Sequence, residues 1–176
     1  MNHNSKIIIG IIGGHLHNTN EKALRLAEKT GEILAKKNIA VACGGEDGIM
    51  EAVCRGCKKF KGTTIGITKS NKKFVANKFI DYVIPTSLDL AFMNVLVWSS
   101  DGIIAFDGRF GTMSELGLAL DIGKPLIALG NHSLINMPEI KMPYFSHYKN
   151  YQDDKLNEAI EHLLLMIKKH REIINR

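Results

Sequence analysis

Three times along this chain, an apolar run ends in a glycine loop that leads straight into helix-like sequence. The loops are Gly13-Gly14, Gly44-Gly45-Glu46-Asp47-Gly48 and Gly108-Arg109-Phe110-Gly111. The isoleucine-rich run 7–12 before the first loop is typical of a strand buried on both faces of a parallel sheet. Strands that alternate with helices in this way predict a Rossmann-like, doubly wound α/β fold with helices on both faces of the sheet.

The other elements follow the same alternation. Strands are expected at residues 6–12, 39–43, 62–67 and 82–84, at the apolar run that begins at Ile103, and at residues 126–130. Helices are expected from Glu21 to about Lys37, from the second glycine loop to about Phe60, over residues 88–100, and from the third glycine loop to about Ile122. Asn18, three positions before Glu21, is the expected cap of the first helix. Residues 131–152 show no clear period, so no element is predicted there.

A single domain over residues 1–176 is expected, because 176 residues with 45% hydrophobic content suffice for one sizeable core. Residues 153–174 predict an amphipathic C-terminal helix with Asp153 as its N-cap. No apolar run approaches the roughly 20 residues that a membrane span needs, and the N-terminus does not resemble a secretory signal. We therefore expect a cytoplasmic protein without a membrane partner.

Charge and cysteine content exclude further classes of function. The formal net charge is +5, but the lysines are spread over helices and loops, which favours a solvated basic surface over a nucleic-acid groove. Three cysteines cannot form a closed disulfide framework. Cys54 and Cys57 have CxxC spacing, yet no second Cys or His pair stands at zinc-finger spacing. We predict that both are small apolar helix residues, with no metal site and no cofactor.

The predicted helix over residues 88–100 is apolar almost all the way round. Such a helix must be buried on more than one side, and in a chain of this size we expect the second side to face another subunit. We therefore predict a homodimer that buries this helix. Asn94 is the polar exception within it, and two interpretations are equally open: it faces a ligand pocket, or it is a hydrogen-bonded interior amide.

The three glycine loops are expected to lie on one edge of the sheet, since the carboxyl ends of parallel strands meet there. Glycine allows a close approach of the main chain to a ligand, and the free N–H groups at a helix start attract anions. No loop matches GxxxxGK[ST] or a clean GxGxxG, which disfavours a P-loop triphosphatase and an ordinary dinucleotide dehydrogenase. The predicted phosphate-binding residues are Gly13, Gly14, Gly44, Gly45, Gly48, Gly108, Arg109, Phe110, Gly111 and Thr112, with Asn94 as a further candidate.

Two of these loops resemble signatures of a known family. Gly44-Gly45-Glu46-Asp47-Gly48-Ile49-Met50 is similar to GGGxxGxM, and Gly108-Arg109-Phe110-Gly111-Thr112-Met113-Ser114-Glu115 is similar to PGGxGTxxE. Both are signatures of the LOG family, the Rossmann-like proteins long mislabelled as lysine decarboxylases. The similarity covers about residues 6–130 and points to short bacterial and archaeal members of unassigned activity. These also resemble the molybdenum-cofactor carrier proteins.

The resemblance implies binding of a nucleoside monophosphate, with the loop from Gly108 to Thr112 on the phosphate. Active LOG enzymes release a base from its ribose 5′-monophosphate with a glutamate and an arginine, and the glutamate maps onto Glu115. The arginine position falls on Met93 or Asn94, so this chain lacks that arginine. The signature is also altered at Asp107 and Arg109, where the family has proline and glycine.

Three hypotheses therefore stay open. The first is nucleotide binding without catalysis, the second is phosphoribohydrolase activity through Glu115, with Arg109 or a lysine in place of the family arginine, and the third is carriage of a pterin cofactor. A carboxylate near the ribose could stabilise the positive charge that develops during N-glycosidic cleavage. Thr112-Met113-Ser114-Glu115 also satisfies S/T-x-x-E, so helix capping is the alternative role of Glu115.

Polar residues of the other loops have two interpretations each. His15 and His17 are expected to be exposed, with contact to a base or ribose as the alternative. At least one of Glu46 and Asp47 is expected to lie at a helix N-terminus, where the dipole stabilises carboxylates. The lysine-rich connection 69–78 is expected to be a mobile surface loop, with a phosphate-facing lid as the second interpretation.

Overall fold

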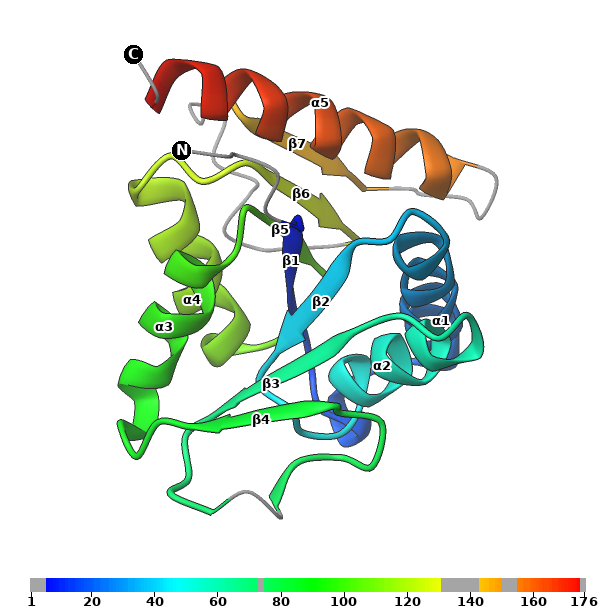
Figure 1. Cartoon of the computed structure of the whole chain (residues 1–176), viewed down its shortest axis with the longest axis vertical. Helices are drawn as coiled ribbons and strands as arrows, with labels where there is room; N and C mark the ends of the chain where they lie inside the picture. Colours follow the sequence, from blue (N-terminus) through cyan, green and yellow to red (C-terminus); the bar gives the residue numbers. More distant parts are fainter. Residues whose placement is uncertain (1–5, 73–74, 131–142, 150–154, 175–176) are drawn as a thin grey trace.

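Seven parallel strands form one sheet in the computed structural model, which describes residues 6–72, 75–130, 143–149 and 155–174 (Figure 1). The strand order is β4-β3-β2-β1-β5-β6-β7, and each neighbouring pair is parallel. The strands are β1 (Ile8–Ile12), β2 (Ala40–Cys43), β3 (Thr64–Thr68), β4 (Tyr82–Pro85), β5 (Gly102–Ala105), β6 (Leu126–Leu129) and β7 (Phe145–Tyr148). This order reverses direction at β1, which is the topological switch point of a doubly wound sheet.

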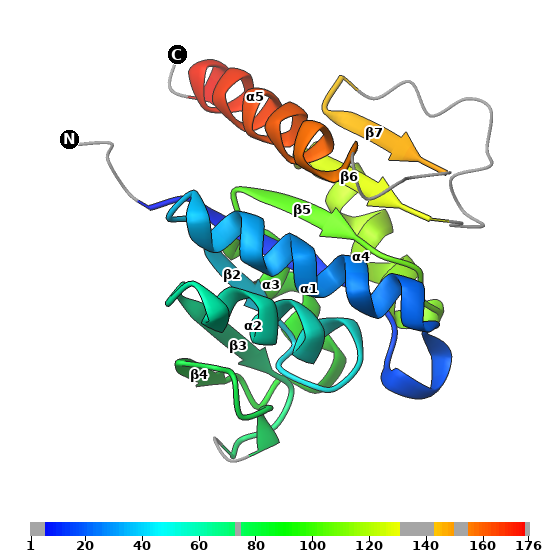
Figure 2. The ribbon, with the colours of Figure 1, turned by 90° about the vertical axis from the view of Figure 1, so that its right-hand side faces the viewer.

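Helices cover both faces of the sheet (Figure 2). One face carries α1 (Glu21–Lys36), α2 (Ile49–Lys59) and α5 (Leu156–Ile174), and the other carries α3 (Phe92–Ser99) and α4 (Phe110–Asp121). Short 3-10 turns η1 (Leu16–Asn18) and η3 (Asp89–Ala91) precede α1 and α3. The α/β fold with helices on both faces is therefore confirmed.

The core consists of two clusters, because successive side chains of a strand point to opposite faces. On β5 and just after it, Ile104 and Phe106 pack on the α1, α2 and α5 side, whereas Ile103 and Ala105 pack on the α3 and α4 side. All four are fully buried. The central strands are buried on both faces, which explains their continuous apolar runs.

Helices α1 and α2 approach each other closely through two glycines. A Cβ atom added to Gly31 would lie 2.0 Å from the carbonyl oxygen of Val53, and one added to Gly56 would lie 1.8 Å from that of Glu28. Cys54 and Cys57 are fully buried in α2, as predicted for small apolar helix residues. The two helices are therefore in backbone contact, and no larger residue fits at the crossing.

Several sequence predictions need correction. Strand β7 was not predicted, because Phe145–Tyr148 is half-buried throughout and shows no alternation. Asn20, not Asn18, caps α1, and its side chain accepts from the Ala23 N–H. Helix α3 begins four residues later than expected, after the 3-10 turn η3. The predicted N-cap Asp153 lies outside the described residues.

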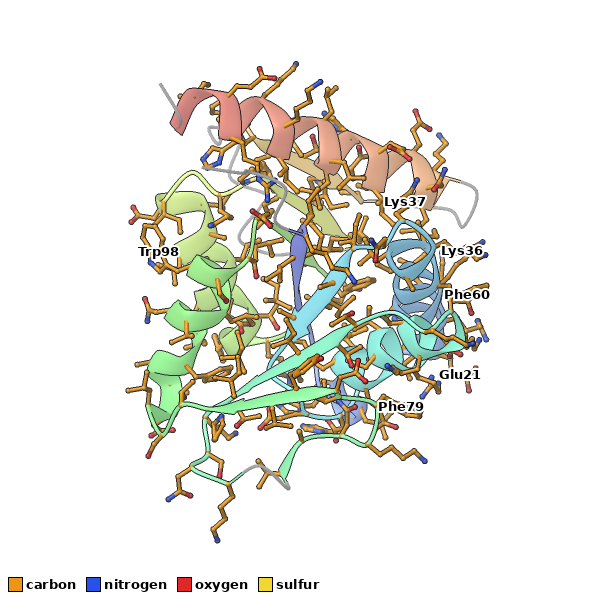
Figure 3. The ribbon with its side chains drawn as sticks, in the orientation of Figure 1. Glu21, Lys36, Lys37, Phe60, Phe79 and Trp98 are labelled. Carbon is orange, nitrogen blue, oxygen red and sulfur yellow. The ribbon has the colours of Figure 1, made fainter. Side chains whose placement is uncertain are left out.

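The 88–100 segment is only partly buried within a single chain, and burial of its other side by a second subunit stays a prediction. Leu88 is 49% exposed, Leu90 66% and Trp98 63%, and Trp98 points away from the body of the protein (Figure 3). Only Leu96 and Val97 of α3 are fully buried. In the part of the chain that the structure describes, no helix is long and apolar enough to cross a membrane.

Candidate functional site

The carboxyl ends of β1, β2, β3 and β5 meet at one edge of the sheet. Ile12 and Ala105, the last residues of β1 and β5, are register partners, so the loops that follow them start at the same level. The Gly14 N–H donates to the Asp107 carbonyl at 2.9 Å, which ties the first glycine loop to the third. The expected meeting of the glycine loops is therefore seen at the switch point, where ligands bind in such sheets.

A pocket of about 200 Å³ lies at this edge. It is lined by Ile11, Ile12, Gly13, Gly14, His15, Asn18, Gly44, Glu46, Met50, Lys69, Leu90, Phe92, Met93, Arg109, Gly111, Thr112 and Glu115. Ligand pockets range over about 300–1,000 Å³, so this pocket is smaller than that range.

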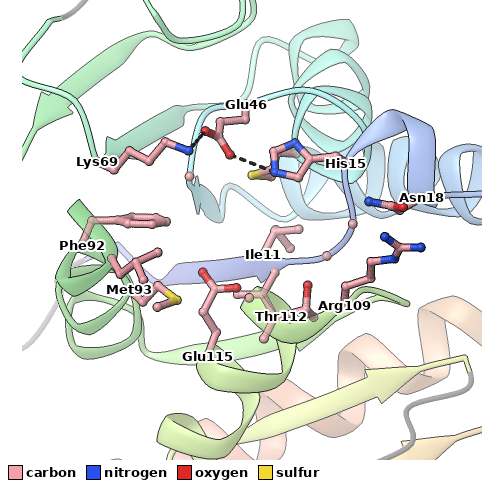
Figure 4. Close-up of a pocket in the computed structure, with 17 residues that line it drawn as sticks. Ile11, His15, Asn18, Glu46, Lys69, Phe92, Met93, Arg109, Thr112 and Glu115 are labelled. Carbon is pink, nitrogen blue, oxygen red and sulfur yellow. Dashed lines mark ion pairs between the residues drawn. The ribbon is translucent and has the colours of Figure 1, made fainter.

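The pocket has a polar end and an apolar end (Figure 4). Arg109 and Asn18 lie at one end, beside Thr112 in the first turn of α4. Phe92 and Met93 of α3 lie at the other end. The guanidinium of Arg109 forms no ion pair with any described residue and is exposed. An anionic group at the polar end would therefore meet an unpaired cation together with the free N–H groups of a helix start.

Gly108 and Gly111 of the third loop differ in what an added side chain would meet. A Cβ atom added to Gly108 would lie 2.1 Å from Thr112 Oγ1, so internal packing excludes a side chain there. A Cβ atom added to Gly111 would meet nothing within 4 Å, although Gly111 lines the pocket. Glycine costs helical stability relative to alanine. Gly111 thus leaves open space where a ligand would approach the backbone of α4.

Glu115 projects from α4 into the middle of the pocket (Figure 4). It is 9% exposed, and no described residue hydrogen-bonds its carboxyl group. Burial raises the pKa of Glu115 to about 8, with a further increase from the negative charge of Glu46. The side chain is therefore mainly protonated at neutral pH. The capping interpretation fails, because Arg109 is the N-cap of α4 and Thr112 lies inside the helix.

Four charged or polar side chains form a row of contacts that begins on the pocket wall facing Glu115. Lys69 Nζ lies 2.8 Å from Glu46 Oε1, and His15 Nε2 lies 3.2 Å from Glu46 Oε2. His15 Nδ1 lies 2.8 Å from Asp47 Oδ1, which also accepts from the Leu16 N–H. Hydrogen bonds from His15 and Leu16 oppose the effect of burial and lower the pKa of Asp47. Gly48, not Glu46 or Asp47, precedes α2 as its N-cap.

The predicted site residues divide into two groups. Those that line the pocket are Gly13, Gly14, Gly44, Arg109, Gly111, Thr112 and Glu115. Those that do not are Gly45, Gly48, Gly108, Phe110 and Asn94. Gly48 packs against the Gly14 carbonyl oxygen, 2.4 Å from its added Cβ atom, and Phe110 is 82% exposed. Both expectations for Asn94 are wrong, because it is exposed and only bonds back to the Ala91 carbonyl.

Sequence reasoning missed some pocket residues and ranked others low. Lys69 directly follows β3 and could have been placed on the same edge by the rule used for the glycine loops. His15 lines the pocket, which was its second interpretation, whereas His17 does not. Phe92 and Met93 gave no signal, since an apolar helix residue is usually a core residue.

A model of the SLOG cluster4 family matches residues 6–160. An uncharacterised protein of Archaeoglobus fulgidus is 36% identical over 121 residues, which cover 69% of this chain and 78% of the relative.

Two solved structures are similar over nearly their whole length. The molybdenum cofactor binding protein from Rippkaea orientalis has 30% identity and a TM-score of 0.80, with 92% of this chain and 99% of that chain covered. The molybdenum cofactor carrier protein from Chlamydomonas reinhardtii has 27% identity and a TM-score of 0.79, with 91% and 99% covered.

Proposed function

The chain belongs to the SLOG cluster4 family, and we propose that its pocket binds a nucleoside monophosphate or a closely related phosphorylated ligand. The observation that carries this proposal is the polarity of the pocket, with Arg109 and the start of α4 at one end and Phe92 and Met93 at the other. A phosphate ester of a heterocycle has the same polarity. Its phosphate would lie at the Arg109 end and its ring at the apolar end.

Titration calorimetry of the purified chain tests this proposal. AMP, GMP and ribose 5-phosphate are expected to bind, whereas adenosine, which lacks the phosphate, is expected to bind at least tenfold more weakly, since hydrogen bonds to charged groups are worth roughly 1.5–3 kcal/mol. Arg109→Ala should weaken all phosphorylated ligands. Arg25→Ala removes an arginine that is 72% exposed on α1 and should change nothing. Equal affinity for AMP and adenosine would contradict a phosphate site.

A second candidate function is hydrolysis of the N-glycosidic bond of the bound nucleotide. The observation that favours it is the buried carboxyl group of Glu115, whose pKa of about 8 leaves it protonated and able to act as a general acid. Incubation with AMP should then release free adenine, and Glu115→Gln should abolish the release. No free base from several monophosphates would leave ligand binding as the function.

The third hypothesis, a carrier of a molybdenum cofactor, is favoured by the similarity to the two carrier structures. The ring of a pterin cofactor would suit the apolar end of the pocket, as the base of a nucleotide would. Retention of the cofactor through size-exclusion chromatography, with AMP as competitor, tests it. A cofactor that elutes apart from the protein would contradict this hypothesis.

We also propose that the chain forms a homodimer through the segment 88–100. Leu88, Leu90 and Trp98 are exposed apolar side chains on this segment, and contiguous exposed apolar surface marks association sites. Sedimentation at micromolar concentration should give the mass of a dimer, and Trp98→Glu should shift it toward the monomer. A monomeric mass for the unaltered chain would overturn this proposal.

A further inference from the structure

Glu46 and Lys69 place an acceptor and a donor side by side on one wall of the pocket. Lys69 Nζ lies 2.8 Å from Glu46 Oε1, and the two residues follow the neighbouring strands β3 and β2. The side chain of Lys69 is 51% exposed and that of Glu46 is 32% exposed, so both can reach a bound molecule. Figure 4 shows them across the pocket from Glu115, with Phe92 and Met93 beside them at the apolar end.

Glu46 is held as an oriented carboxylate. Its second oxygen lies 3.2 Å from His15 Nε2, and His15 Nδ1 lies 2.8 Å from Asp47. Glu46 thus lies between a lysine and a histidine, whereas Glu115 on the opposite wall is buried without such partners. One wall therefore offers a charged acceptor and the other a neutral carboxyl group.

The paired groups leave hydrogen-bonding capacity for a ligand. Each carboxylate oxygen has two lone-pair positions, so each oxygen of Glu46 keeps one after its ion pair. A carboxylate can accept two parallel N–H groups, and an ammonium beside it can donate to a neighbouring carbonyl. The complementary ring edge carries a carbonyl, a ring N–H and an exocyclic amino group in a row.

Resting on the proposed function, we infer that the pocket prefers phosphorylated ligands with a 2-amino-4-oxopyrimidine edge, as in guanine nucleotides and pterin phosphates. Glu46 accepts from the ring N–H and the amino group, and Lys69 donates to the carbonyl. Hypoxanthine lacks the amino group, and adenine offers Glu46 one N–H donor. Each of these rings therefore leaves one acceptor position of Glu46 without a partner.

Calorimetric titration with GMP, IMP, AMP, neopterin 3′-phosphate and ribose 5-phosphate tests this preference. GMP is expected to bind about tenfold more tightly than IMP or AMP, which is the effect of one hydrogen bond to a charged group. Glu46→Gln and Lys69→Met should each reduce the ratio of GMP to AMP affinity toward one, while the affinity for ribose 5-phosphate stays within about twofold. Glu51→Gln alters a carboxylate on α2 outside this pocket and should keep the ratio.

The outcomes separate this inference from the proposed function. Binding of ribose 5-phosphate with equal affinities for GMP, IMP and AMP would overturn the preference and leave the phosphate site intact. Absence of binding by every phosphorylated probe would overturn both. A GMP preference that persists in both Glu46→Gln and Lys69→Met would also overturn the assignment to this pair. Tighter binding of neopterin 3′-phosphate than of GMP would support recognition of this ring edge and identify pterin phosphates as the preferred ligands.

Discussion

The two helix pairs that flank the sheet use glycine in opposite ways. Between α1 and α2, an added Cβ atom at Gly31 or Gly56 would meet backbone atoms at 2.0 and 1.8 Å. In α4, an added Cβ atom at Gly111 or Gly117 would meet nothing within 4 Å. Glycine is thus required by packing on one face, and on the other face it leaves space. The face with α1 and α2 therefore needs glycine for close helix packing, whereas α4 leaves open space at Gly111, which lines the pocket.

The two faces also differ in whether a carboxyl group has charged partners. On the first face, Glu28 lies 2.8 Å from Arg55 and 2.7 Å from Lys59, and these contacts lower the pKa of Glu28. On the second face, the buried carboxyl group of Glu115 has no hydrogen-bond partner among the described residues, and its pKa is raised. One carboxylate favours folding and the other opposes it, which is common where a group serves a ligand.

The largest effect on the stability of the folded protein is expected from the titration of Glu115 as the pH changes. The folded protein keeps a proton on Glu115 up to a pKa of about 8, whereas the unfolded chain releases it near 4.5. The contribution of Glu115 to stability should therefore fall as the pH rises from 4.5 to 8, by up to roughly 1.4 kcal/mol per pH unit or about 5 kcal/mol in total, and this contribution should not change outside the window.

Urea denaturation of the unaltered chain and of Glu115→Gln at several pH values measures this contribution. The variant should lack the decrease and be the more stable protein at pH 8. Glu51→Gln serves as the control and should follow the unaltered chain. Parallel pH curves for all three proteins would show that Glu115 titrates normally.

The next largest effect is expected at the crossing of α1 and α2. Gly31→Ala forces a methyl group against the backbone of α2, which cannot move aside as a side chain can. We expect a loss of about 3 kcal/mol in the free energy of unfolding, at the upper end of overpacking effects. Circular dichroism during thermal unfolding measures it. A loss below about 0.5 kcal/mol would show that the helices separate easily.

The smallest effect on stability, with the opposite sign, is expected in α4. Gly117→Ala adds a methyl group in open space on the exposed side of the helix. Alanine is favoured over glycine within a helix by roughly 0.5–1 kcal/mol, so the variant should unfold at a higher temperature. A lower unfolding temperature would mean that α4 packs against something at this position, such as a second subunit.

The sequence predicted the fold well where strands are buried on both faces, because their continuous apolar runs differ from every other segment. It failed at β7, an edge strand whose half-buried residues carry no such run. It placed the start of α3 too early, since Ser87 and Asp89 adopt positive φ angles of 57° and 47°, which interrupt a helix. Helical spacing alone did not predict these local conformations.

The candidate site was predictable where it depends on topology and unpredictable where it depends on side-chain direction. Glycine loops after parallel strands had to share an edge, and Gly13, Gly44 and Gly111 line one pocket. Asn94 follows Met93 directly, yet it faces solvent while Met93 faces the pocket. The ion pair of Glu46 with Lys69 joins residues from two loops, and no spacing rule connects them.

A comparison of two alanine variants tests most directly whether α4 leaves space for a phosphorylated ligand. Gly111→Ala and Gly117→Ala each add one methyl group to the same helix, and only Gly111 lines the pocket. Calorimetric titration with GMP should show an affinity at least about tenfold lower for Gly111→Ala, as expected when an ion contact is displaced, and an unchanged affinity for Gly117→Ala. Equal affinities in both variants and the unaltered chain would contradict the proposed site.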